Sequence, residues 1–151
     1  MPPSPNYHGN VYSSLKDVLQ RVPQIDSDRV YYRPSSADKR YLEAYVRPDR
    51  LDSLIGAEDP TITVKWTQHP SPDEFRIDYA DPNIQFHCGW HQDDDHPEYG
   101  EMHFQYDHPG LDKLVYQAAT VEAITPPRIL WDILDRLFVN IIPSVAAPLY
   151  R

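Results

Sequence analysis

The sequence predicts an α+β domain in which an antiparallel β-meander packs against a C-terminal amphipathic helix, with a short helix before the sheet. From Pro60 onward, apolar and polar residues alternate with a period of two, which is typical of strands with one buried face. Short turn-forming segments separate these runs, and short connections join antiparallel neighbours. A wide apolar stripe at helical spacing then closes the chain. The 151 residues suffice for one such domain.

The N-terminal part predicts a tail followed by a short amphipathic helix. Residues 1–10 are rich in proline, which favours a disordered tail and leaves residues 11–151 as a single domain. Ser13 or Ser14 can cap the helix, and Pro23 lies just beyond its end. Its apolar stripe consists of Leu15, Val18, Leu19 and Val22.

β-Branched and aromatic residues mark the segments in which we expect strands. The first two lie on either side of the turn-prone residues 34–38, and residues 81–83 mark a later turn. Residues 50–55 fit a single helical turn before Gly56. The expected strands are 30–32, 41–46, 61–66, 75–79, 84–90, 101–106 and 114–119.

The closing helix is expected to cover the apolar face of the sheet. Thr125 is placed to cap it, Pro126 and Pro127 suit its first turn, and Pro143 is expected to end it. A helix on this face leaves the opposite face of the sheet open. Its apolar stripe consists of Ile129, Leu130, Ile133, Leu134, Leu137, Phe138 and Ile141.

Composition predicts an acidic cytoplasmic protein. The formal net charge is -9, and the bias towards Asp (17, against 6 Glu) and Arg (10, against 4 Lys) resembles that of proteins from salt-loving archaea. The single Cys88 cannot form an internal disulfide, which fits the cytoplasm. The first residues lack a charged and apolar leader, and no run approaches the roughly 20 apolar residues of a membrane span, so we expect neither a signal peptide nor a membrane partner.

Charge is unevenly distributed along the chain. Residues 29–50 contain six basic and three acidic residues, whereas residues 84–112 contain seven acidic residues and no Lys or Arg. This difference predicts one surface that attracts phosphate and another that attracts cations. The alternative is that the arginines are scattered over the surface of a salt-adapted protein.

Five of the seven histidines lie between residues 86 and 108, where we place the candidate functional site. Side chains alternate across a sheet, so His87, His91 and His103 are expected on one face if their apolar neighbours face the core. His96 and Glu98 would lie on the connection above this face. A solvated loop without chemistry is the simplest alternative.

Two kinds of chemistry fit this cluster. In the first, His87, His91 and His103 bind a divalent transition metal such as zinc, and the candidates for further ligands are His96, Asp93, Asp95 and Glu98. In the second, paired groups cleave an RNA phosphodiester by acid–base catalysis, with His96 acting together with Glu98 or His103. That reaction also needs a cation for the developing negative charge, for which an arginine of residues 29–50 is the candidate. The sequence contains no P-loop, dinucleotide-binding or serine-hydrolase motif.

The stretch from Trp90 to Glu98 resembles the signature of the TumE-type toxins of toxin–antitoxin systems. In that family a Trp-Asp-Asn-Ala-Pro-His-His-Pro-Glu stretch precedes a second histidine-rich segment. Trp90, His96, Pro97 and Glu98 match it in register, and His103 falls near the second segment. The sequence departs from the pattern at residues 91–95, where His, Gln and three Asp replace the family residues.

The resemblance implies a small α+β protein that cleaves RNA and is paired with a helix-turn-helix antitoxin. We therefore expect a toxin-like ribonuclease with His96, Glu98 and His103 as catalytic residues, and with His87, His91 and Asp95 as candidate metal ligands. The expected partners are RNA, the antitoxin and a second copy of the chain. Two other functions remain open: a non-enzymatic protein-binding module that uses the helix or a tyrosine-rich surface, and a metal-binding protein.

Overall fold

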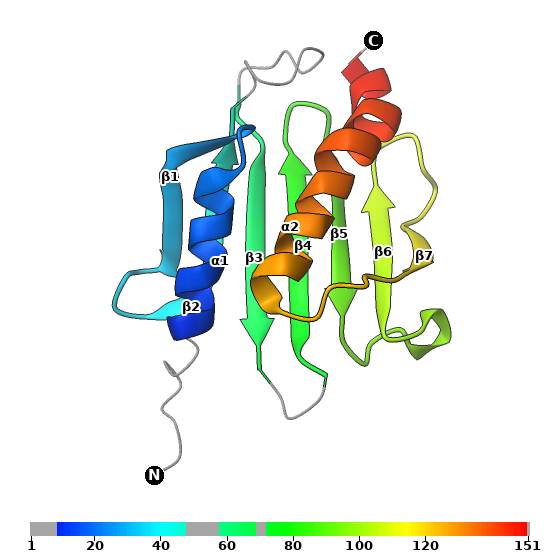
Figure 1. Ribbon diagram of the computed structural model, residues 1–151. Coiled ribbons are helices and arrows are strands. Elements are labelled where there is room, and N and C mark those ends of the chain that lie inside the picture. Colours follow the sequence, from blue (N-terminus) through cyan, green and yellow to red (C-terminus); the bar gives the residue numbers. More distant parts are fainter. Residues whose placement is uncertain (1–8, 48–57, 69–71, 151) are drawn as a thin grey trace.

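The computed structural model describes residues 9–47, 58–68 and 72–150, and it confirms the α+β class (Figure 1). In the described residues one sheet of seven strands carries both helices on the same face. The elements are α1 (Gly9–Arg21), β1 (Ile25–Pro34), β2 (Lys39–Val46), β3 (Thr61–Thr67), β4 (Glu74–Asp81), β5 (Phe86–Gln92), η2 (Pro97–Tyr99), β6 (Met102–Asp107), β7 (Val115–Ala119), α2 (Pro126–Arg136), η3 (Leu137–Ala146) and η4 (Ala147–Tyr150).

The sheet is the meander that the short connections predict. Its strand order is β1 to β7 in sequence order, and each neighbouring pair is antiparallel. β1 is much longer than the predicted segment 30–32 and contains a register irregularity between Ile25 and Val30. The remaining strands differ from their predicted bounds by a few residues at their ends.

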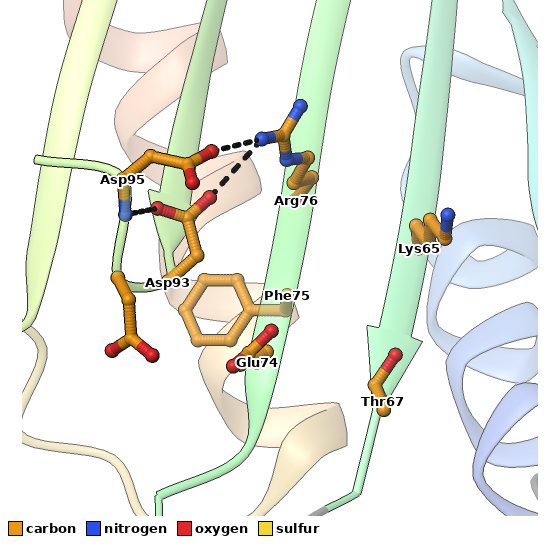
Figure 2. Close-up of a pocket in the computed structure, with 8 residues that line it drawn as sticks. Lys65, Thr67, Glu74, Phe75, Arg76, Asp93 and Asp95 are labelled. Carbon is orange, nitrogen blue, oxygen red and sulfur yellow. Dashed lines mark hydrogen bonds and ion pairs between the residues drawn. The ribbon is translucent and has the colours of Figure 1, made fainter.

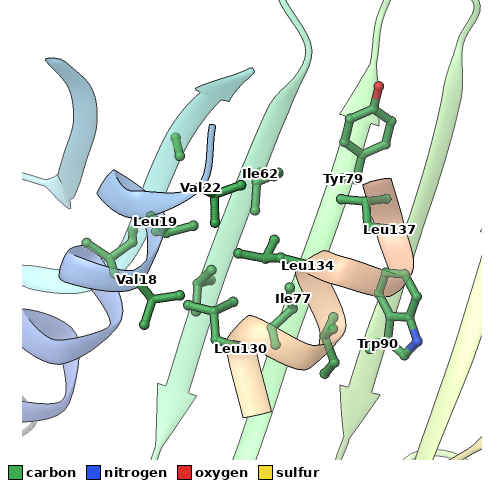
Figure 3. Packing of buried hydrophobic residues seen from close by; sticks show 14 of the residues in the cluster. Val18, Leu19, Val22, Ile62, Ile77, Tyr79, Trp90, Leu130, Leu134 and Leu137 are labelled. Carbon is green, nitrogen blue, oxygen red and sulfur yellow. The ribbon is translucent and has the colours of Figure 1, made fainter. Parts of the chain in front are cut away.

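The core lies between the helices and the face of the sheet that they cover (Figure 3). Leu19 of α1 and Leu130 and Leu134 of α2 project towards Ile62 and Ile77 of the sheet, and all five are fully buried. This burial explains why the amphipathic patterns fold in this way, because apolar side chains leave water only when both helices lie on the same face.

The first helix begins earlier than expected. α1 starts at Gly9, so Ser13 and Ser14 lie inside it, and the Ser14 hydroxyl donates a hydrogen bond to the Val11 carbonyl instead of capping the helix. Residues 9 and 10 of the predicted tail therefore belong to the helix. Residues 1–8 and the helical turn predicted at 50–55 lie outside the described residues.

The prediction that Pro143 ends the last helix is wrong. α2 passes without a break into the wider π-helical turns of η3, which include Pro143, and then into one tight turn, η4. Ile142 and Ala146 remain buried on either side of Pro143, so packing against the sheet keeps the chain helical there. In the described part of the chain, no helix is both long and apolar enough to span a membrane.

Candidate functional site

Two positive side chains and two imidazoles form one row across the helix-free face of the sheet. Lys65 of β3 pairs with Arg76 of β4, Arg76 pairs with His91 of β5, and His91 pairs with His103 of β6. Directly paired residues in antiparallel strands share a face and have Cβ atoms about 5 Å apart. The expectation that His91 and His103 share a face is therefore confirmed.

The adjacent row supplies the groups that orient these imidazoles. It contains Asp78 of β4 and Gln105 of β6, with Gly89 of β5 between them. His91 Nε2–H donates to Asp78 Oδ1 at 2.6 Å, and His103 Nε2–H donates to Gln105 Oε1 at 2.8 Å. Because a carboxylate can only accept, a neutral His91 carries its proton on Nε2, and the amide oxygen of Gln105 favours the same tautomer of His103. The partner atoms thus orient both rings.

Gly89 leaves the space in which Asp78 reaches His91. A Cβ atom at position 89 would lie 2.0 Å from Asp78 Oδ1 and 3.0 Å from His91 Nε2. A residue with a side chain would therefore displace the carboxylate or the ring. We conclude that the absence of a side chain at position 89 is a structural requirement of the Asp78–His91 pair.

The β5–β6 connection adds a third imidazole to the site. η2 begins at Pro97 and follows His96, whose ring centroid lies 5.0 Å from that of His103 and 4.3 Å from that of Tyr116 on β7. The centroids of His91 and His103 are 5.3 Å apart. The three imidazoles therefore form one contiguous cluster, which we call the imidazole cluster.

The members of the imidazole cluster differ in their access to solvent. His103 is 1% exposed and His91 is 6% exposed, whereas the side chain of His96 is 30% exposed. Tyr99 of η2 stacks on Tyr116 with ring centroids 5.7 Å apart and closes the cluster on the β7 side. A ligand therefore meets His96 first.

Glu98 is a partner of His96, because its Oε1 lies 3.3 Å from His96 Nδ1. The pKa of Glu98 is lowered, mainly by a hydrogen bond to its own backbone and further by its contact with His96. Glu98 is therefore ionised at neutral pH and accepts a hydrogen bond from Nδ1–H of His96. Nε2 of a neutral His96 is then free to accept a proton.

A shallow hollow of about 460 Å³ lies beside the imidazole cluster, between β3, β4 and residues 93–95 (Figure 2). Arg76 Nη2 lies 3.3 Å from Asp93 Oδ2 and 2.8 Å from Asp95 Oδ2. In Figure 2 the helices lie behind the sheet, so these side chains project from the helix-free face. Arg76 is thus held at the edge of the imidazole cluster by the acidic connection.

Among the described residues, the cation nearest to the imidazole cluster is Arg76, and not an arginine of residues 29–50 as the sequence predicted. Arg33 of β1 pairs with Glu43 at 3.0 Å, and Arg29 pairs with Asp59 at 2.6 Å. β1 is four strands away from β5, or about 19 Å at the usual strand spacing. Arg50 lies outside the described residues.

The candidate metal ligands do not converge. His87 and His91 are four residues apart on β5, which places them about 13 Å apart along a strand. Asp95 is engaged by Arg76, and His87 pairs with Ala80 and Asp107 at the other end of the strand. Across residues 9–47, 58–68 and 72–150, no three His, Cys, Asp or Glu side chains are arranged to hold a metal ion.

Sequence reasoning missed several residues of the site. Arg76 and Asp78 occupy the polar positions of an alternating strand, so their face was predictable, but their partners depend on the pairing register. Gly89, Tyr99 and Tyr116 carried no signal that distinguished them from ordinary strand and turn residues.

Comparisons of the chain with protein-family models, with curated proteins and with solved structures found no match.

Proposed function

We propose that the protein is a ribonuclease that cleaves RNA phosphodiester bonds at the imidazole cluster. The observation that carries this proposal is the convergence of His91, His96 and His103 on the open face, with a carboxylate beside two of the three rings and Arg76 in the same row. Cleavage of RNA needs a proton acceptor, a proton donor and a positive charge close together. The imidazole cluster and Arg76 together contain a candidate for each of these groups.

The most exposed ring is the candidate general base. Glu98 orients His96 so that Nε2 takes the proton of the ribose 2'-hydroxyl. The 2'-oxygen then attacks phosphorus, and the bond from phosphorus to the 5'-oxygen breaks to leave a 2',3'-cyclic phosphate. His103 in its protonated form is the candidate acid for the leaving 5'-oxygen, and Arg76 supports the negative charge that develops on the phosphate.

Access to His103 requires the β5–β6 connection to move, because His103 is 1% exposed beneath His96 and Tyr99. We infer that RNA displaces this connection when it binds. Such coupling of binding to the assembly of a site is common in enzymes whose loops carry catalytic groups.

We further propose that the ribonuclease is the toxin of a toxin–antitoxin pair, with a helix-turn-helix protein as antitoxin. The resemblance to TumE-type toxins supports this step, because its matching residues His96, Pro97 and Glu98 form the part of the connection that meets the imidazole cluster. The fourth matching residue, Trp90, is buried and packs on Phe104, so its role is in the core.

The test compares RNA cleavage by the purified protein and by His96→Ala, with His108→Ala as the matched control. His108 lies on the β6–β7 connection and packs on Tyr106, outside the imidazole cluster. We expect a loss of about 100-fold or more in His96→Ala, as for other general bases, and little change in the control. No cleavage by the wild type, or equal cleavage by both variants, would contradict the proposal.

The same protein and variant also test metal binding and the toxin–antitoxin proposal. Elemental analysis of the purified protein detects a tightly bound metal. Expression of the wild type and of His96→Ala in a growing host tests toxicity, which should depend on His96. Co-expression with the product of an adjacent reading frame should restore growth if that product is the antitoxin.

A further inference from the structure

A second group of flat side chains lies on the open face. It belongs to β1 and β2, near the edge of the sheet that is farther from the imidazole cluster. The Arg29 guanidinium lies 3.9 Å from the ring centroid of Tyr45, and that of Arg33 lies 4.5 Å from the ring centroid of Tyr31. The Tyr31 and Tyr45 rings meet edge to face at 6.2 Å. We call these four residues the tyrosine–arginine platform.

The pairing register places this platform and the imidazole cluster on the same face. Tyr31 pairs with Glu43, Glu43 with Thr63 and Thr63 with Asp78, which is the partner of His91. Two strands lie between the platform and β5: β3 presents Thr61, Thr63, Lys65 and Thr67 on this face, and β4 presents Glu74, Arg76 and Asp78. A ligand that crosses the sheet between the two groups therefore meets hydroxyl groups, Lys65 and Arg76, as well as the carboxylates of Glu43 and Asp78.

The platform is held in a form that suits stacking. Arg33 donates from both Nε and Nη2 to Glu43 Oε1, and Arg29 donates to Asp59 Oδ2. These ion pairs fix the planes of the guanidinium groups, while Tyr31 remains 37% exposed and the Arg33 side chain 34% exposed. Exposed tyrosine rings and arginine planes on a sheet are surfaces on which unpaired nucleotide bases stack.

We propose that the tyrosine–arginine platform binds bases of a single-stranded RNA whose cleaved bond lies at the imidazole cluster. This inference rests on the proposed function and names its substrate class. From β1 to β5 is four strand spacings, or about 19 Å. The substrate is therefore a single strand of at least about four nucleotides, at the lower end of the site sizes of single-strand-binding folds. A dinucleotide is too short to reach both groups.

The test measures binding separately from cleavage. The probes are single-stranded RNA oligonucleotides of two to ten nucleotides in which every 2'-hydroxyl is methylated, so that no 2'-oxygen can attack. Tyr31→Ala removes one stacking surface, and Tyr31→Phe keeps it. Trp131→Ala is the matched control, because Trp131 is 40% exposed on α2, in the helical layer that covers the other face of the sheet.

We expect Tyr31→Ala to bind the longer strands about five- to a hundredfold more weakly, which is the usual range for loss of one stacked base. Tyr31→Phe and Trp131→Ala should bind like the wild type. Dinucleotides should bind the wild type and Tyr31→Ala equally weakly, because they do not span both groups.

Several results would overturn the inference. One is the absence of RNA binding by the wild type, and another is equal binding of long strands by the wild type and Tyr31→Ala. A third is a change of oligomeric state in Tyr31→Ala without a change in RNA binding, which would indicate that the platform is a protein interface. Binding of methylated strands that depends on Tyr31, without cleavage of unmodified RNA, would support the platform and overturn the proposed ribonuclease.

Discussion

The hydroxyl groups of Tyr79 and Tyr150 lie near the same buried carboxylate but differ in their hydrogen bonds. Tyr150 donates to Asp81, which is 1% exposed and also accepts from Asn83. The Tyr79 hydroxyl is buried and finds no partner among the described residues. Burial raises the pKa of both tyrosines, so both remain protonated over the physiological range. The Asp81–Tyr150 bond attaches the end of the helical layer to β4.

This difference predicts opposite effects of two equivalent substitutions. Tyr79→Phe removes an unpartnered hydroxyl and should leave the free energy of unfolding unchanged or raise it by up to about 1 kcal/mol. Tyr150→Phe leaves Asp81 without one donor and should lower it by about 1–3 kcal/mol. Urea unfolding at neutral pH measures both. An equal loss in the two variants would mean that Tyr79 has a partner in solution.

Gly89→Ala should separate Asp78 from His91 without unfolding the sheet. The added Cβ would overlap Asp78 Oδ1, which must then leave the His91 ring. We expect the Nε2 proton signal of His91 to change in NMR spectra. Gly110→Ala is the control, because the added Cβ meets only the His108 ring, at 3.1 Å or more. Retention of the His91 signal in Gly89→Ala would show that the added Cβ is accommodated without breaking the Asp78–His91 hydrogen bond.

The alternation of side chains was enough to predict which residues share a face, but not which residues touch. It placed His91 and His103 on the open face correctly. The Asp78–His91 contact depends on how β4 pairs with β5, and a shift of one residue would put Asp78 on the other face. The expected metal ligands His87 and His91 do not converge for a simpler reason, because residues four apart lie about 13 Å apart along a strand.

At the scale of elements, α2 contributes four buried residues to the core, namely Ile129, Leu130, Ile133 and Leu134. Leu130 is fully buried against the sheet, whereas its neighbour Trp131 is 40% exposed. Leu130→Ala should lower the free energy of unfolding by about 2–5 kcal/mol. Trp131→Ala should change it by about 0.5 kcal/mol or less, as for other surface substitutions. A large loss in Trp131→Ala would show that its ring contributes to packing at the pocket that it lines together with Val22 and Pro23.

Glu98, on the β5–β6 connection, has a lowered pKa, and this predicts how its carboxyl group titrates. A carboxyl group whose pKa is lowered in the folded protein stabilises the fold above its unfolded pKa, and this contribution is lost as the pH falls through the folded pKa. The Glu98 carboxyl should thus titrate below its usual range in carbon-detected NMR. In His96→Ala the midpoint should rise only part of the way to the usual value, because the main cause is the backbone hydrogen bond of Glu98. A full return would assign the shift to His96.

Element boundaries were predicted best where burial and local pattern agree. Each described strand overlaps a segment with alternating or β-branched residues. The end of the last helix could not be predicted, because Pro143 is a local signal for termination and the burial of Ile142 and Ala146 is a property of the whole fold. In the same way, Ser13 and Ser14 looked like caps because nothing in the preceding residues indicates a helix.

At the scale of the whole molecule, the layers separate stability from chemistry. Both helices cover one face of the sheet, and the imidazole cluster and the tyrosine–arginine platform lie on the other. Substitutions on the open face can therefore change a site without creating a cavity in the core. This separation makes the variants proposed above interpretable as tests of function.

The net charge predicts that salt stabilises the protein. With a formal charge of -9, repulsion between carboxylates opposes the compact state, and raising NaCl from about 0.1 M to 1 M shortens the screening length from about 10 Å to 3 Å. The midpoint of unfolding should rise over this range of NaCl concentration. Sucrose at equal osmolarity is the control, because it is uncharged and stabilises proteins without screening charges. Asp94→Asn removes an exposed charge from the run 93–95 and should reduce the dependence on salt. A midpoint that falls with salt would show that ion pairs such as Arg76 with Asp95 outweigh the general repulsion.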